Sequence, residues 1–491
     1  MKPEEFDILL ERHLDGSLTE SEEHALTEIL GEHEWAQDRF VDRMSLAADL
    51  RDRLTADSPR VSKVAIFPKS SPTKKIAIGL AAAAALAFGM FLLQSEGPAP
   101  KVRVIAAEGV GTLDSEALHS GRRIKLRHGL LELELNGESR VVIEGPAKFK
   151  IVSPRLLELS SGRCFAEMKK GRSGLRIETP AGKVLDLGTK FAVDVTSPKE
   201  MKVHVFDGMV EVSDGPTKKR LTEGQSIRVA DAQFAEQPAD SSLFIPRVPR
   251  AEIDTTPYVY WGFNEGQGET FSAAGRDLQP EKGIGSFTQR GNAAAKPTWV
   301  SGIDGSALEF DSKVWANTEH PGIGGNQDRT VACWIKIPDD PKQNELSPLI
   351  SWGLREGKET SQSWMLAVAR YTLKKPETAG VLALNFGNQR SFGTTNLRDG
   401  QWHHVAVVAM EVEDGSAILF YIDGQLESTS RAPLEFDTEI GENLAFPIQF
   451  GRHLFARDAI LRGTLDEAYL FAAALSGDEI RQLMTRRPSQ P

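Results

Sequence analysis

The chain has 491 residues, enough for about three or four domains of ordinary size. Charged residues make up 26% and hydrophobic residues 40%, a composition typical of globular protein that buries several cores. The net charge of -11 argues against sequence-independent nucleic-acid binding, which needs a basic surface, so we expect no direct nucleic-acid partner. Two cysteines, Cys164 and Cys333, are too few for a disulfide framework or a multi-thiolate zinc site. A single disulfide between them remains an alternative, and two separately buried thiols are the favoured interpretation.

The first 57 residues are acidic and have the periodicity of helices. Residues 1–58 hold 6 Lys and Arg against 16 Asp and Glu, a net charge of -10. Apolar residues recur at helical spacing in three stretches, and Thr19 followed by Glu22 is a capping-box signature before the second. We therefore predict a small helical bundle over residues 1–57. Its histidines have no cysteine nearby and no i, i+4 pairing, so we expect no metal there.

A basic linker and an apolar run come next. Residues 58–75 carry three prolines, four serines and five basic side chains, which is typical of a linker. Residues 76–93, IAIGLAAAAALAFGMFLL, are uncharged and just long enough to span ~30 Å of hydrocarbon as a helix. Because basic residues crowd the N-terminal flank, the N-terminus is predicted to be cytosolic. The sequence therefore predicts a single-pass inner-membrane protein with most of its mass in the periplasm; a buried core helix is the alternative.

Residues 101–245 have the pattern of short β-strands. Five glycines each open a short run of alternating apolar and polar residues: Gly121, Gly162, Gly182, Gly208 and Gly224. A turn glycine followed by period-two alternation is a strand signal. Its recurrence predicts short strands stacked in a sandwich or a solenoid-like sheet.

Residues 255–485 are predicted to form a β-sandwich. Aromatic and β-branched runs alternate with Gly and Asp turns, and Asp423-Gly424 has the composition of a two-residue hairpin turn. Ser476, with Glu479 three residues later, predicts the capped start of a short helix near the end of the chain.

The N-terminal half resembles a family of membrane regulators. The stretch LLERHLDGSLTESEEHALTEIL is similar to the helical domain of membrane anti-sigma factors, in a version that lacks the zinc-binding cysteines. LDLGTKFAVDV, VHVFDGMVEV and LTEGQSIRV resemble the core of FecR-type regulators, in which this domain lies in the periplasm behind one membrane span. The resemblance implies a sigma factor as cytosolic partner, and Phe40 and Met44 are our candidates for apolar contacts with it. Members that read iron transporters carry a C-terminal signalling subdomain that is replaced here, so we do not expect siderophore sensing.

The C-terminal half resembles LamG-like, concanavalin A-type jelly rolls over residues 255–485. The segments that carry this resemblance are YWGFNEGQGETF, GIDGSALEFD, RTVACWIKI, QWHHVAVV, FYIDGQL and GTLDEAYLFAAALSGDEIRQL. The resemblance implies a recognition module whose core is filled by Trp334, Ile335, Trp402, Val405, Val407, Phe420 and Ile422. Trp315, Trp352 and Trp364 lie in less regular stretches, so we predict that they form a platform for carbohydrate.

Catalytic motifs are missing from the sequence. It contains no GxSxG, HExxH, phosphate-binding loop or EF-hand loop, so we expect neither an enzyme nor a cofactor. Asp466 and Glu467 are adjacent on a predicted strand and point to opposite faces, so they cannot flank one bond; one of them caps a turn or holds calcium. The sequence favours an anti-sigma-type signal transducer whose external part senses a glycan or an envelope protein. The alternatives are a membrane-tethered carbohydrate-binding or adhesion protein without a transcriptional role and, last, a glycoside-active enzyme.

Overall fold

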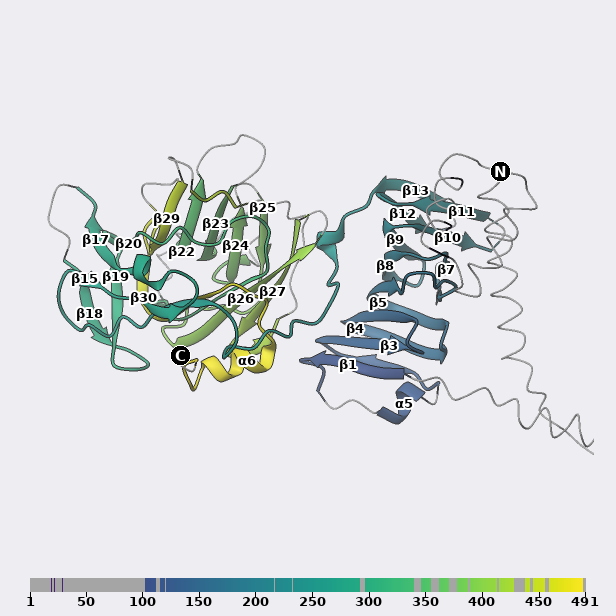
Figure 1. The fold of residues 1–491 in the computed structure, drawn as a ribbon, viewed down its shortest axis with the longest axis horizontal. Helices are drawn as coiled ribbons and strands as arrows, with labels where there is room; N and C mark the ends of the chain where they lie inside the picture. Colours follow the sequence, from purple (N-terminus) through teal and green to yellow (C-terminus); the bar gives the residue numbers. More distant parts are fainter. Residues whose placement is uncertain are drawn as a thin grey trace, which may run out of the picture.

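The computed structural model describes two β-rich units joined by a linker (Figure 1). It describes residues 102–111, 115–119, 121–215, 217–231, 233–291, 296–339, 346–354, 362–370, 378–386, 389–412, 415–427, 438–441, 445–454 and 459–488, with Thr19, Glu22 and Ile29. The fold is therefore mainly β, as predicted. The helical bundle, with Phe40 and Met44, otherwise lies outside the described residues, as do the basic linker and the predicted span.

Two findings touch the N-terminal predictions. The Thr19 amide donates to the Glu22 carboxylate at 2.9 Å, which is half of the predicted capping box. Within the described ranges, no helix is both long enough and apolar enough to cross a membrane.

The first unit is one 13-stranded sheet, here called the first sheet, with strand order β11-β10-β7-β6-β5-β8-β9-β12-β13 and β1 to β4 attached through β5. Its elements are β1 (Val102–Glu108), α5 (Ser115–His119), β2 (Ile124–Leu126), β3 (Leu130–Leu135), β4 (Ser139–Ser153), β5 (Leu156–Met168), β6 (Arg176–Thr179), β7 (Gly182–Asp186), β8 (Lys190–Ser197), β9 (Glu200–Asp207), β10 (Met209–Asp214), β11 (Thr217–Thr222), β12 (Gln225–Ala230) and β13 (Gln233–Pro238). Nearly all neighbouring strands are antiparallel, and one face of the sheet encloses an apolar core.

The predicted turn glycines behave in two ways. Gly121, Gly208 and Gly224 have positive φ and lie just before strands, as the alternation predicts. Gly162 instead lies inside β5, opposite a bulge in β4. A Cβ at Gly162 would be 2.6 Å from the Ala147 Cβ, so this glycine permits close backbone approach rather than a turn.

The second unit is a two-sheet sandwich. The nine-stranded sheet, here called the proximal sheet, has the order β16-β14-β30-β21-β26-β27-β28, with β18 and β19 attached to β30. The eight-stranded sheet, here called the distal sheet, has the order β15-β17-β20-β29-β22-β23-β24-β25. The proximal strands are β14 (Tyr258–Trp261), β16 (Ala274–Arg276), β18 (Thr298–Ser301), β19 (Ser306–Asp311), β21 (Arg329–Lys336), β26 (Trp402–Val412), β27 (Gly415–Ile422), β28 (Gln425–Leu426) and β30 (Arg462–Phe471). The distal strands are β15 (Thr270–Phe271), β17 (Gly285–Gln289), β20 (Val314–Thr318), β22 (Ser347–Leu354), β23 (Ser363–Val368), β24 (Leu382–Phe386), β25 (Gln389–Phe392) and β29 (Ala445–Phe450).

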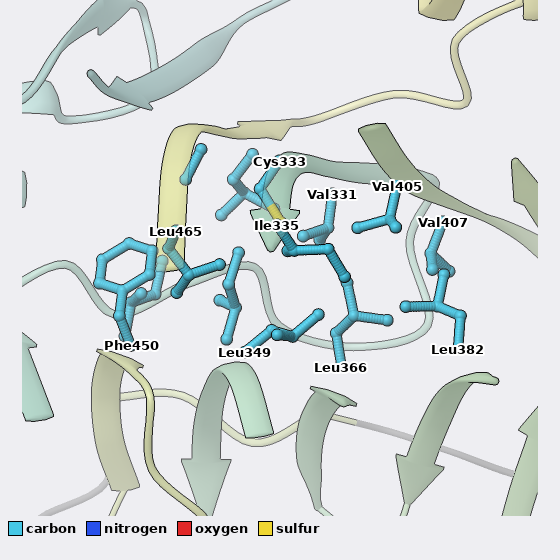
Figure 2. Packing of buried hydrophobic residues seen from close by; sticks show 14 of the residues in the cluster. Val331, Cys333, Ile335, Leu349, Leu366, Leu382, Val405, Val407, Phe450 and Leu465 are labelled. Carbon is cyan, nitrogen blue, oxygen red and sulfur yellow. The ribbon is translucent and has the colours of Figure 1, made fainter. Parts of the chain in front are cut away.

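The sandwich core lies between these two sheets (Figure 2). Of the predicted core residues, Ile335, Val405, Val407, Phe420 and Ile422 lie in it. Trp334 and Trp402 were wrongly placed there. Side chains alternate between the two faces of a strand. Trp334 is next to Ile335 and Trp402 is three residues before Val405, so both tryptophans lie on the outward face of the proximal sheet and are half-buried.

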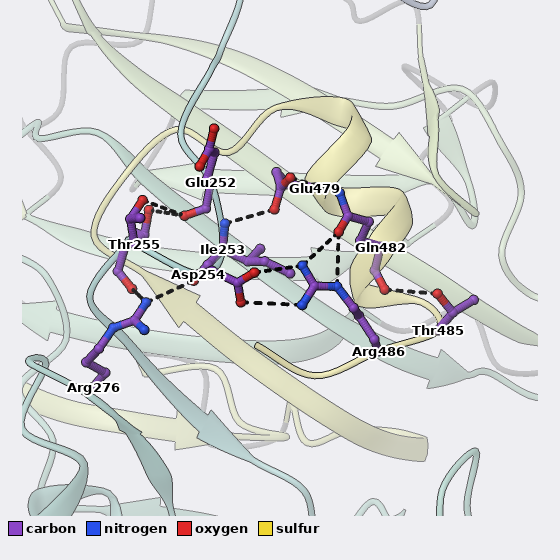
Figure 3. Close-up of polar contacts among 10 residues, drawn as sticks. Glu252, Ile253, Asp254, Thr255, Arg276, Glu479, Gln482, Thr485 and Arg486 are labelled. Carbon is purple, nitrogen blue, oxygen red and sulfur yellow. Dashed lines mark hydrogen bonds and ion pairs between the residues drawn. The ribbon is translucent and has the colours of Figure 1, made fainter. Parts of the chain in front are cut away.

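The predicted local signals near the C-terminus are present. Asp423 and Gly424, with φ of 49° and 73°, form the turn between β27 and β28. Helix α6 (Gly477–Leu483) begins after Ser476, whose hydroxyl accepts from the Glu479 amide. The Glu479 carboxylate does not complete a capping box; it accepts from the Ile253 amide of the linker at 2.9 Å (Figure 3).

The linker between the units, residues 239–257, is tied to both of them. It contains one short 3-10 element, η2 (Ser241–Leu243); a second, η3 (Pro280–Gly283), follows β16 in the sandwich. The Asp254 carboxylate pairs with Arg486 beyond α6 at 2.8 Å, and Arg276 donates to the Ile253 carbonyl at 3.0 Å (Figure 3). These contacts hold the linker against the sandwich.

The two units share a buried apolar cluster. It joins the outward face of the first sheet, the linker and the outward face of the proximal sheet; members include Leu130, Phe165, Phe206, Phe244, Val248, Val408, Leu419 and Tyr421. Charged contacts lie beside it: Glu132 is fully buried and accepts from the Val248 amide at 2.9 Å, and Arg481 of α6 lies 3.1 Å from buried Glu108 of β1. Both faces of β27 are therefore covered.

Candidate functional site

Two of the three predicted platform tryptophans are core residues. Trp352 and Trp364 are register partners on β22 and β23, both have 0% exposed surface, and their rings stack at 5.2 Å. The Trp352 indole donates to the Ile323 carbonyl at 3.0 Å. The prediction that these two residues bind carbohydrate is wrong, because both positions face inward on the distal sheet and no ring face is open.

Trp315 is the third predicted residue, and its side chain lies on the opposite, outward face of the distal sheet. It is half-buried, and its indole donates to Asn317 at 3.1 Å. The Arg452 guanidinium lies 4.3 Å from the ring centroid, a cation–π contact that covers one face. The structure therefore leaves Trp315 as an aromatic surface residue but does not bring it together with Trp352 and Trp364.

A cleft on the outward face of the proximal sheet holds an indole that the sequence-based prediction missed. The cleft has a volume of about 1060 Å³. Its polar lining includes a continuous cross-strand row, formed by Glu309, Thr464, Lys336 and Trp402 on β19, β30, β21 and β26. Trp402 begins β26 and is half-buried, so part of its indole lines the cleft beside polar groups.

The charges in this cleft are balanced. Three acids, Glu309, Asp311 and Asp339, and three bases, Lys313, Lys336 and Arg462, line it. Lys313 and Asp311 lie 3.6 Å apart, and both side chains are well exposed. A site with an indole, many hydrogen-bonding groups and no net charge suits an uncharged sugar, which stacks through its C–H face and exchanges hydrogen bonds through its hydroxyls.

Asp466 and Glu467 have structural partners. The buried Asp466 carboxylate accepts from the Ile303 amide at 2.7 Å and caps that turn, one of the two predicted roles. Burial raises the pKa of Asp466 to about 7. Glu467 instead accepts from Tyr260 and from Arg487, the latter at 2.9 Å. Across the described ranges, no three His, Cys, Asp or Glu side chains are grouped so as to hold a metal ion.

In the first sheet, the LDLGTKF motif builds a corner around a buried carboxylate. Asp186 has 0% exposed surface and accepts from three amides, those of Gly174 at 3.2 Å, Gly188 at 3.1 Å and Thr189 at 2.8 Å, and from the Thr189 hydroxyl. Burial raises the pKa of Asp186 to about 7, against the opposing effect of these hydrogen bonds. Asp186 thus fixes the turn between β7 and β8 and does not face a ligand.

The cysteines are two separate buried thiols, as favoured from the sequence. Cys164 lies in the core of the first sheet and Cys333 in the core of the sandwich. Burial raises the pKa of both thiols, which keeps them protonated and unreactive at neutral pH.

Family comparisons agree with this division of the chain. Residues 118–211 match the FecR protein family, and residues 310–481 match the concanavalin A-like lectin/glucanases superfamily. The chain joins a FecR region to a concanavalin A-like jelly roll. Both family resemblances found in the sequence are thereby confirmed. No curated protein matches the chain in sequence.

Several solved structures are similar to parts of the chain. Domain 4 of AbnA, a GH43 extracellular arabinanase from Geobacillus stearothermophilus solved with arabinotriose, is 16% identical, with 49% of this chain and 100% of that one covered and a TM-score of 0.34. The binding domain of Paraclostridial Mosquitocidal Protein 1 is 14% identical, with 48% and 52% covered and a TM-score of 0.33. A protein described as an anti-sigma factor from Parabacteroides distasonis is 22% identical, with 24% and 61% covered and a TM-score of 0.22.

Proposed function

We propose that this protein is a single-pass membrane signal transducer of the anti-sigma type. Residues 1–57 bind a sigma factor in the cytosol, residues 76–93 cross the inner membrane, and the FecR region and jelly roll lie in the periplasm. The jelly roll binds a glycan in the Trp402 cleft without altering it chemically. The order of an acidic segment, an apolar run and a FecR region along the chain supports the membrane-signalling part of this proposal.

The observation that carries this proposal is the buried contact between the FecR region and the jelly roll. A recognition module joined by a flexible tether could bind its ligand without any effect on the FecR region. Here the linker is held on both sides, by Glu132 of β3 and Glu479 of α6, and an apolar cluster continues across it. A ligand that favours one arrangement of the jelly roll therefore has a packed route to the FecR region.

Co-purification of the full-length chain with the sigma factors of its own cell tests the cytosolic half of the proposal. We expect retention of one sigma factor at low salt, where the attraction of an acidic domain for a basic partner is strongest. Replacing both Phe40 and Met44 by alanine should reduce retention by about 30-fold, since each change removes roughly 1 kcal/mol of apolar contact. Trp402→Ala is the matched control and should retain the sigma factor normally. If no sigma factor is retained, the tethered carbohydrate-binding alternative is favoured.

Trp402→Ala should in turn weaken binding of an uncharged polysaccharide by about 30-fold, which corresponds to the ~2 kcal/mol lost when a central aromatic contact is removed. Affinity electrophoresis of the full-length protein in gels that contain dextran, arabinan or xylan would measure the change. Trp334→Ala, which removes a half-exposed indole outside the cleft lining, is the control. Equal binding by both variants would exclude the cleft, and reducing-sugar release by the pure protein would make it an enzyme.

A further inference from the structure

The first sheet carries an open cleft of its own, here called the basic cleft. It has a volume of about 650 Å³ and is lined by residues of β2, β4, β5 and β8. Lys125 and Lys148 in its lining alternate along their strands with the core residues Leu126 and Phe149, so they point away from the core of the sheet. Both lysines and Arg127 are exposed in the presence of the jelly roll, so the cleft is open to solvent.

A bulge in β4 shapes the basic cleft. Glu144 and Lys148 of β4 pair in register with Arg163 and Ser161 of β5, so three residues of β4 stand opposite Gly162 alone. A side chain at Gly162 would clash with these residues, so the bulge packs directly on the glycine. Extra residues in one strand bend it and redirect its side chains, and such bulges are common beside functional sites. Strand pairing therefore fixes the wall of the cleft.

Three basic side chains in this cleft have no acidic partner. Lys125 and Lys148 stand directly opposite each other in the β2–β4 pair, and Arg127 follows β2 and lines the cleft beside them. Among the residues that the structure describes, none of the three makes an ion pair. Like charges directly opposite each other destabilise an antiparallel strand pair. The cleft therefore holds positive charge that the protein itself does not neutralise.

Charged residues elsewhere on the first sheet are arranged differently. Register partners of opposite charge that form ion pairs are Arg103 with Glu134, Arg140 with Glu167, Lys150 with Glu158, Arg163 with Asp194, and Lys183 with Glu178. Lys202 and Arg228 are also like-charged register partners, but each has an acid beside it: Arg228 pairs with Glu200, and Lys202 stands opposite Asp194. The facing lysines in the basic cleft lack such a counter-charge, which a bound anion would supply.

Other groups in the basic cleft suit an anion that carries more than one negative charge. Ser161 and Thr196 add hydroxyl donors to the lining. The two acids of the lining flank Arg163: Asp194 Oδ2 lies 3.2 Å from its Nε, and Glu144 is its register partner on β4. Charge is thus balanced at the Arg163 end and positive at the β2 end. One carboxylate would leave two of the three bases without a counter-charge, whereas a phosphate monoester carries close to two negative charges and three acceptor oxygens.

We infer that the basic cleft binds a phosphate monoester, with Lys125, Lys148 and Arg127 around the phosphate oxygens. The cleft is larger than a phosphate group, so it also accommodates the sugar or glycerol that carries the phosphate. A soluble phosphate ester and a phospholipid headgroup offer the same chemistry. The basic cleft belongs to the FecR region and shares no residue with the Trp402 cleft, so the inference does not depend on the proposed function.

Binding of the full-length protein to glycerol phosphate, and to phosphatidate in phosphatidylcholine vesicles, tests this inference, with phosphatidylcholine vesicles alone as the blank. Lys125→Gln and Lys148→Gln each remove one of the facing charges, and each should weaken binding by about tenfold because a charge-assisted contact is lost. Their melting temperatures should be unchanged or raised, since each change also relieves the repulsion between the two lysines. Lys218→Gln, which changes the net charge equally at an exposed position of the distant strand β11, is the control.

The outcomes separate the alternatives. Binding of glycerol phosphate that both cleft variants weaken and Lys218→Gln leaves unchanged would establish a site for a soluble ester. The same pattern with phosphatidate vesicles alone would assign the site to a lipid headgroup. Equal weakening by Lys218→Gln, binding that neither cleft variant alters, or no binding of either probe would overturn the inference. Binding of polyglutamate in place of both probes would also overturn it and would make the cleft a docking surface for an acidic protein. Trp402→Ala should bind the phosphate probes normally, so failure of the glycan proposal leaves this test intact.

Discussion

Replacing Asp186 by alanine is expected to lower the free energy of unfolding of the FecR region by about 3 kcal/mol or more. The alanine leaves the Gly188 and Thr189 amides and the Thr189 hydroxyl without their acceptor inside a closed corner, whereas the Gly174 amide keeps its bond to the main-chain carbonyl of residue 186. Each buried donor that loses its partner costs roughly 1–3 kcal/mol, and water cannot replace the carboxylate at a position with 0% exposed surface. Denaturant unfolding of the full-length protein, followed by circular dichroism, would measure the change.

Asp186→Asn is the matched variant. Its carbonyl can keep the three bonds made by Oδ1, but its NH₂ would face the Gly174 amide, donor against donor. We therefore expect the free energy of unfolding of Asp186→Asn to lie between those of the wild type and the alanine variant. The pH dependence gives a second test. Because burial raises the pKa of Asp186 in the folded protein to about 7 from its ordinary value of 3.8, its stabilising contribution is full below pH ~4 and is lost as pH rises through 7.

Asp186→Asn does not titrate, so its deficit relative to the wild type should shrink between pH 4 and pH 7. A deficit that stays constant over this range would show that the carboxyl is ionised throughout. A loss below ~1 kcal/mol for the alanine variant would show that the corner holds without its acceptor.

Local signals in the sequence predicted local structure correctly. The Asp423-Gly424 turn, the Ser476 cap and the strands after Gly208 and Gly224 depend on backbone conformations that a few adjacent residues determine. The predictions that were wrong concern features that depend on a neighbouring strand. Gly162 has the same alternating neighbours as the turn glycines, yet it lies mid-strand because a distant bulge in β4 brings Ala147 against it.

The tryptophans show how the candidate site was misjudged. Because side chains alternate along a strand, Trp334 and Ile335 cannot lie on the same face, and neither can Trp402 and Val405. That signal was present in the sequence. Trp352 and Trp364 were harder, because Gly353 and the neighbouring loop blur the period of β22. Their burial follows from register pairing across the distal sheet, which one strand does not encode.

Glu132→Ala is expected to uncouple the FecR region from the jelly roll. The side chain is fully buried at the junction, where it accepts from the Val248 amide at 2.9 Å and pairs with Arg250 at 2.5 Å. Removing it leaves the Val248 amide unpaired and costs about 2–3 kcal/mol, with the half-exposed Arg250 adding little because solvent screens it. Calorimetry should show the units melting together in the wild type and separately in the variant, and proteases should cut residues 239–257 faster.

Two further substitutions make this result specific to the junction. Glu132→Gln keeps an acceptor for the Val248 amide and should lose less than half as much stability. Glu236→Ala removes an exposed glutamate, paired with Lys219, at the edge of the same sheet, and should change stability by less than ~0.5 kcal/mol. If the units still melt together in Glu132→Ala, the apolar cluster alone holds the junction.

The same variant separates recognition from transmission. Glu132 does not line the Trp402 cleft, so Glu132→Ala should bind polysaccharide with wild-type affinity. If the packed junction carries the signal, a transcriptional reporter for the co-purified sigma factor should respond to that polysaccharide in the wild type and fail to respond in Glu132→Ala. A normal response in a variant whose units melt separately would mean that the jelly roll acts by holding the FecR region at the ligand rather than by changing its structure.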